Sequence, residues 1–75
     1  MFSKEIFSQR LRALREETET SRQDLADELS MTYFSVAKME NAERAASIET
    51  LWALADYFDV SLDYLVGRSN DPKHR

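Results

Sequence analysis

The chain has 75 residues, of which 43% are apolar, and it contains one glycine, one proline and no cysteine. A chain of this length buries about 60 to 65% of the surface that its unfolded form exposes, which leaves room for one small core. The absence of cysteine excludes disulfides, thiolate metal sites and thiol nucleophiles. Regular apolar periodicity with so little glycine and proline favours a compact helical domain over disorder or an all-β fold.

The formal net charge is −4, which argues against a nucleic-acid partner because DNA affinity depends largely on neutralising phosphates. The charges are unevenly distributed, however, with cations gathered in residues 4–15 and carboxylates in residues 16–28 and 56–63. A locally basic surface is therefore compatible with the acidic total. No apolar run approaches the roughly 18 residues of a membrane span, and residues 1–5 open no signal-peptide run. We expect a cytoplasmic protein with no membrane partner.

The first predicted element is an amphipathic helix over about residues 3–17. Its apolar side chains repeat at i, i+4 and i+7, the spacing of one helix face: Phe7, Leu11 and Leu14. This helix is expected to be the scaffold of the domain. Arg10 and Arg12 are expected to form a basic patch on it, with a role in steering a charged partner.

Residues 21–41 predict two short helices with almost no linker between them. Ser21 is a typical N-cap for the first helix, and Thr32 offers an N-cap for the second only three residues after Leu29. Val36 and Met39 supply the inward side of the second helix. Its remaining faces carry Tyr33, Phe34, Ser35 and Lys38. A close helix pair with polar and aromatic residues facing outward suits entry into a DNA groove.

Two further helices are predicted in the C-terminal half. Ser47 caps a fourth helix with a continuous apolar stripe, formed by Leu51, Leu54, Ala55 and Phe58. Ser61 caps a last short helix, which Gly67 can close in the left-handed conformation. Residues 69–75 are polar and contain Pro72, so they predict a tail or the start of a linker. The domain should therefore comprise residues 1–68.

The order of these features resembles the Cro and phage-repressor helix-turn-helix family, whose bacterial members are often called XRE-like regulators. The resemblance covers about residues 7–68 and rests on five helices and four motifs: Leu25-Ala26, Met39-Glu40-Asn41, residues 47–51 and residues 61–68. It implies an all-α, five-helix, lambda-repressor-like DNA-binding domain with a helix-turn-helix. In that family the second helix of the motif, here about residues 33–41, lies in the major groove.

The resemblance also implies roles for individual residues. Base contacts are implied for Tyr33, Phe34, Ser35 and Lys38. Phosphate contacts are implied for Arg22, Thr32, Asn41 and Arg44. Arg22 stands where the family usually has glutamine, and a cation at this place can still meet a phosphate. The family's buried ion pair between the first helix and the groove helix maps onto Arg15 and Glu40.

Three departures from the family pattern affect these expectations. Ser30 replaces the usual glycine at the turn, at a cost of about 1 kcal/mol for a left-handed backbone. Glu19 and Thr20 replace the glycine that usually ends the first helix, so we expect a differently shaped connection. Tyr33 and Phe34 stand where polar base readers are common. These rings could touch thymine methyl groups, or one of them could fold back on the core.

The C-terminal aromatic residues leave two alternatives, a dimer contact and core packing. Core packing is favoured for Phe58 and Leu65. Trp52 and Tyr64 are the candidates for a homodimer contact. A homodimer would read two half-sites about one turn of DNA apart, because its two-fold axis imposes a matching palindrome.

The parts of a catalytic site are missing from the sequence. The only histidine, His74, lies in the polar tail, and a single glycine cannot form a phosphate-binding loop. We expect no enzyme, cofactor or metal. We interpret the chain as a transcription regulator that binds a double-stranded DNA operator as a homodimer, as a repressor that occludes a promoter. The alternatives are a helix-turn-helix module for a protein partner, such as an antirepressor, antitoxin or DNA mimic, and the DNA-binding end of a longer regulator.

Overall fold

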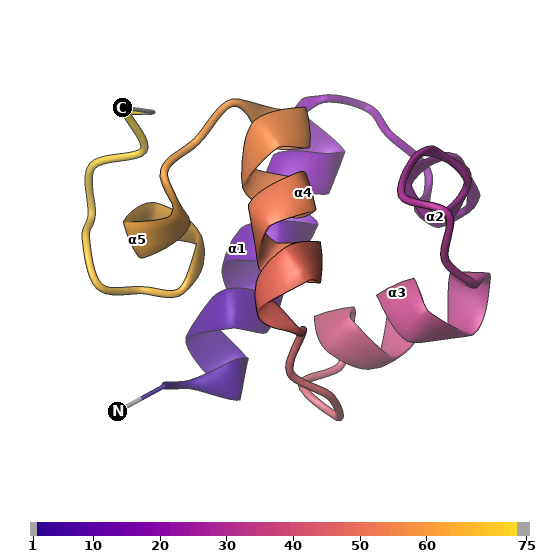
Figure 1. The fold of residues 1–75 in the computed structure, drawn as a ribbon, viewed down its shortest axis with the longest axis horizontal. Coiled ribbons are helices and arrows are strands. Elements are labelled where there is room, and N and C mark those ends of the chain that lie inside the picture. Colours follow the sequence, from indigo (N-terminus) through magenta and orange to yellow (C-terminus); the bar gives the residue numbers. More distant parts are fainter. Residues whose placement is uncertain (1, 74–75) are drawn as a thin grey trace.

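A computed structural model describes residues 2–73 of the chain. Within this range the secondary structure consists of five helices and no strand (Figure 1): α1 (Lys4–Glu17), α2 (Arg22–Glu28), α3 (Tyr33–Glu40), α4 (Ile48–Phe58) and α5 (Leu62–Leu65). The predicted all-α, five-helix fold is therefore confirmed. In the same range no helix combines the length and the apolar character needed to cross a membrane.

Each helix begins after a serine or threonine that caps it. The hydroxyl group of the cap accepts a hydrogen bond from the backbone N–H three residues later and so satisfies one donor that the helix cannot pair itself. The five caps are Ser3, Ser21, Thr32, Ser47 and Ser61. These side chains explain why the helices start where the sequence predicts.

Left-handed residues turn the chain at the ends of the helices. Four of them are not glycine, namely Glu19, Ser30, Ala42 and Asp59, with φ between 53° and 59°. Ser30 thus adopts the conformation expected from its place in the turn. Gly67 closes α5 with φ 88°, and a Cβ atom there would lie 2.6 Å from Cγ2 of Ile6. The single glycine therefore occupies a position that requires glycine, both for its positive φ and because a side chain there would collide with Ile6.

One hydrophobic core joins the five helices. α1 packs against α3 and α5, α2 packs against α3, and α4 packs against α5. The core comprises Phe7, Leu11, Leu14, Leu25, Ala26, Val36, Met39, Leu51, Leu54, Ala55, Phe58, Val60 and Leu65. Figure 1 shows α5 on one side of α1 and α4, and the α2–α3 pair on the other side. The helix pair therefore projects from the body of the domain.

The segment after α5 runs back beside that helix (Figure 1). The backbone N–H of Ser61 donates to the carbonyl of Pro72 at 3.2 Å, and the N–H of Arg68 donates to the carbonyl of Asp63 at 2.8 Å. The part of the predicted tail that the structure describes, residues 69–73, thus lies against the domain. His74 and the residue after it lie outside the described residues.

Candidate nucleic-acid interface

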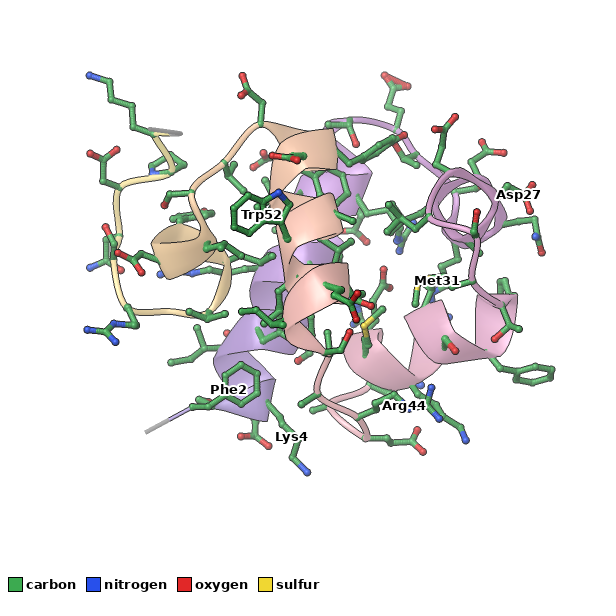
Figure 2. All side chains as sticks on the ribbon, in the orientation of Figure 1. Phe2, Lys4, Asp27, Met31, Arg44 and Trp52 are labelled. Atoms are coloured by element: carbon green, nitrogen blue, oxygen red, sulfur yellow. The ribbon has the colours of Figure 1, made fainter. Side chains whose placement is uncertain are left out.

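One face of α3, the second helix of the pair, is buried against the rest of the domain. Val36, Met39 and Glu40 are buried, and Met31, in the connection, lies between the two helices (Figure 2). The turn between the two helices is short, with Ser30 in the left-handed conformation. The opposite face of α3 is presented to solvent.

A buried carboxylate ties α3 to the two preceding helices. The Glu40 side chain has no exposed surface and accepts hydrogen bonds from Arg15 Nε at 2.5 Å and Arg15 Nη2 at 3.2 Å. Arg22 Nε donates to the same carboxylate at 3.0 Å. Arg12 Nε lies 3.8 Å away, and Arg12 Nη2 donates to the backbone carbonyl of Glu40 at 3.3 Å. Three guanidinium groups around one carboxylate leave this arginine cluster, Arg12, Arg15 and Arg22, with an excess of positive charge.

The structure therefore places the implied pair Arg15 and Glu40 in contact and adds two partners that the sequence analysis missed. Arg12 and Arg15 are three residues apart on α1 and so share a face, which was the available signal. Arg22 was expected to face a phosphate. Its Nε is instead engaged with Glu40, while the rest of the partly exposed guanidinium remains near the surface.

Tyr33 links the arginine cluster to the start of α3. The pKa of the Arg22 guanidinium is raised, first by its interaction with the Tyr33 side chain and then by its hydrogen bond to Glu40. The Tyr33 ring also meets the Phe34 ring edge-on, with centroids 6.3 Å apart and planes at 84°. Tyr33 thus stands between a buried charge network and an exposed aromatic side chain.

The outer face of α3 carries three residues at helical spacing: Phe34, Lys38 and Asn41. Phe34 is 74% exposed, more than any other large hydrophobic residue that the structure describes. Lys38 and Asn41 are also exposed, and Asn41 is the C-cap of the helix. We call these residues the outer face of α3.

Ser35, for which a base contact is implied, holds Arg44 in this structure. Its hydroxyl oxygen accepts hydrogen bonds from Thr32 Oγ1 at 3.0 Å and from Arg44 Nη1 at 3.1 Å. The Thr32 hydroxyl in turn accepts from the Ser35 backbone N–H as the N-cap. Arg44 is thereby held against α3 from the following loop, as Figure 2 shows. Ser35 positions a cation in this structure.

Arg10 and Arg12 do not form the basic patch expected on α1. Residues two apart on a helix point in different directions, and these two side chains contact different parts of the fold. Arg10 donates to the backbone carbonyls of Tyr64 and Ser69 and to Asn70 Oδ1, whereas Arg12 turns to Glu40. Arg10 thus holds the segment after α5 against α1 through Ser69 and Asn70.

The two candidates for a dimer contact lie in different surroundings. Trp52 is 62% exposed on α4 (Figure 2). Ile48, one turn earlier, is 68% exposed, and the two residues form an apolar stripe. Trp52 also borders a groove of about 600 Å³ lined by α4, α5 and residues 69–73. Tyr64 is half-buried, and the Arg10 guanidinium lies 4.2 Å from the centre of its ring. Trp52 is therefore the more accessible of the two.

A capped helix pair whose second helix has a buried inner face and an exposed outer face, set in a five-helix domain, defines a helix-turn-helix protein. Residues 11–65 match the family model HTH_3, described as helix-turn-helix, and the chain belongs to this family. The match includes all of α2, α3 and α4.

Two relatives from Bacillus subtilis (strain 168) are named as uncharacterized HTH-type transcriptional regulators. YobD is 31% identical over 67 residues, which cover 89% of this chain and 60% of the relative. YqaE is 34% identical over 67 residues, which cover 88% of this chain and 58% of the relative. The chain therefore spans about three fifths of the length of these relatives.

A solved structure shares the fold. The restriction-modification controller protein C.AhdI from Aeromonas hydrophila superposes with a TM-score of 0.76 at 29% sequence identity. The likeness covers 83% of this chain and 94% of the other. The two chains thus share the arrangement of their helices over most of the length of each.

Proposed function

We propose that the chain is a transcription regulator that binds operator DNA with α3 in the major groove. The observation that carries this proposal is the division of α3 into two faces. Its inner face is buried and held by Glu40 and the arginine cluster, while Phe34 and Lys38 are exposed on the other face. A helix with exposed side chains is what direct readout of base edges requires.

Phosphate contacts are proposed at both ends of α3. Thr32 caps its N-terminus, and Ser35 in its first turn holds Arg44 there. Asn41 caps its C-terminus, and Arg22 donates to Glu40, the last residue of the helix. Cations at these places neutralise phosphates on either side of a groove and so set the register of the helix. They supply a local positive charge that the net charge of −4 conceals.

The proposed regulator acts as a homodimer and represses by occluding a promoter. The exposed stripe of Ile48 and Trp52 on α4 supports self-association, because apolar side chains this exposed gain from burial in an interface. A two-fold dimer presents two α3 helices to half-sites about 34 Å apart. Sedimentation should detect the dimer, and Trp52→Ala should shift the protein toward the monomer.

Selection of bound duplexes from a random DNA library tests the proposal. An enriched sequence is expected, and fluorescence anisotropy should show that its affinity falls with salt, with a log–log slope of about −0.9 for each phosphate neutralised. Absence of both enrichment and binding at low salt would overturn the proposal.

A second candidate function, binding to a protein partner, is favoured by the surface of α2. Asp24, Asp27 and Glu28 are exposed on this helix, and Asp27 points outward in Figure 2. Their charge repels phosphates near α3 and suits a basic protein surface. Two results together would favour this function. The first is that the selection yields no bound DNA, and the second is that the chain captures a basic protein whereas the Asp27→Lys variant does not.

A further inference from the structure

Phe34 is the outermost large apolar side chain on the proposed reading helix. With 74% of its surface exposed, it contributes little to the core, so the fold does not account for its presence. The Tyr33 ring meets it edge-on, and Tyr33 itself interacts with Arg22, which is anchored to Glu40. Phe34 thus has an aromatic neighbour on one side and solvent around most of its ring.

The two neighbouring aromatic side chains are not equivalent in this arrangement. Tyr33 is 43% exposed, carries a hydroxyl group, and interacts with Arg22, whose pKa it raises. Phe34 has no hydrogen-bonding atom in its side chain. It can discriminate among bases only through apolar contact.

The geometry points to Phe34 as a specificity-determining residue that selects thymine through its 5-methyl group. This inference rests on the proposed function, with α3 in the major groove. There each base pair displays hydrogen-bonding atoms, and the thymine methyl is the one apolar group among them. An exposed phenyl ring placed against any other base edge would cover polar atoms without pairing them, at a cost in affinity.

Lys38 predicts a second base of the half-site, close to this thymine. It follows Phe34 by four residues on the same face, which is about 6 Å along the helix axis. Lysine donates to the O6 and N7 acceptors of guanine. Because base pairs are stacked about 3.4 Å apart, the selected half-site should contain a guanine within about two base pairs of the thymine.

Replacement of thymine by deoxyuridine tests the inference, since it removes the methyl group and leaves every hydrogen-bonding atom in place. Each thymine of the selected half-site is replaced in turn, and affinity is measured by anisotropy with the wild-type chain and with Phe34→Ala. One position should bind the wild-type chain about fourfold more weakly, which corresponds to the loss of one buried methyl group. Phe34→Ala should bind the thymine and deoxyuridine duplexes equally well at that position.

Phe2→Ala is the matched control, because it removes another exposed phenylalanine, at the start of the chain and away from α3 in Figure 2. It should retain the fourfold preference. If the duplex is bound but no thymine shows a preference that depends on Phe34, this inference is wrong while the proposed function stands. If no duplex is enriched or bound, the proposed function fails first, and this inference fails with it.

Discussion

Arg15 on α1 grips Glu40 on α3 through two hydrogen bonds, from Nε at 2.5 Å and from Nη2 at 3.2 Å, and the carboxylate has no exposed surface. A buried carboxylate is stabilising only while its partners are present. The contact joins the scaffold helix to the helix that we propose enters DNA. The contact therefore helps to fix the position of the outer face of α3, together with the buried side chains of Val36 and Met39.

Glu40→Gln should strongly destabilise the domain, because three guanidinium groups would then surround a neutral side chain. Breaking a buried ion pair costs about 3 to 5 kcal/mol, a large part of the stability of a small domain. Urea denaturation followed by circular dichroism measures this loss. Glu43→Gln changes an exposed carboxylate just beyond α3 and should have little effect. Equal stability of the two variants would contradict the role given to Glu40.

The three arginines of the cluster should contribute unequally to stability. Arg15→Ala removes three hydrogen bonds of the least exposed side chain, two to Glu40 and one to the Thr20 carbonyl, and Arg22→Ala removes one to Glu40. Arg12→Ala removes a long hydrogen bond to the Glu40 carbonyl, at 3.3 Å, and an ion pair at 3.8 Å from the most exposed member. An ion pair this exposed is worth about 1 kcal/mol or less and is screened by salt. The expected order of destabilisation in urea is thus Arg15, Arg22, Arg12. A loss in the Arg12 variant that equals that of Arg15 would refute this order.

Ala42→Gly should stabilise the domain. Ala42 has φ 59°, a conformation that costs an L-residue about 1 to 2 kcal/mol and glycine very little. Part of the gain is offset by the greater freedom of glycine in the unfolded chain. A net gain near 1 kcal/mol would raise Tm by about 4 to 8 °C in a domain of this size.

Ala37→Gly is the control for this effect, since it makes the same chemical change inside α3. There glycine costs about 1 kcal/mol, so Tm should fall. Calorimetry on both variants decides the matter: a lower Tm for both would mean that the backbone at Ala42 carries no strain.

Local features of the sequence predict most of this fold. Ser21 and Thr32 cap helices at the predicted positions because capping depends on atoms within three residues. Apolar spacing predicts the core for the same reason, since helical periodicity is local. The left-handed turn at Ser30 follows from its place between two helices. These parts need no knowledge of the tertiary structure.

The partners of the charged residues could not be predicted in this way. Arg10 contacts residues more than 50 positions away, and Arg22 shares a carboxylate that the resemblance implied for Arg15 alone. Ser35 was expected to face bases, but its hydroxyl holds Arg44 from the next loop. Long flexible side chains select partners only after the helices have packed. The candidate site is therefore less predictable from the sequence than the fold that carries it.

Arg10→Ala should loosen the segment after α5 while leaving α2 and α3 intact. Arg10 donates to the Ser69 carbonyl at 2.6 Å and to Asn70 Oδ1 at 2.8 Å. Without these bonds the contact between Ser61 N–H and the Pro72 carbonyl should open more often. Amide hydrogen exchange of Ser61 should accelerate relative to that of core amides in α1. Unchanged exchange at Ser61 would show that Arg10 is not needed to hold the segment.

Lys38→Ala should weaken DNA binding without affecting the fold. Lys38 is exposed on α3, and none of the described residues pairs with its ammonium group by an ion pair or hydrogen bond, so its removal costs the domain little stability. If it donates to a base or phosphate, the affinity for the selected duplex falls, and a lost phosphate contact also lowers the salt slope by about 0.9. Lys73→Ala is the control, because this lysine lies in the segment beside α5, on the other side of the domain from α3 (Figure 1). Anisotropy and Tm are measured on both variants. Equal affinities of the two would remove Lys38 from the interface, whereas a selective loss in Lys38→Ala at constant Tm would place the outer face of α3 against DNA.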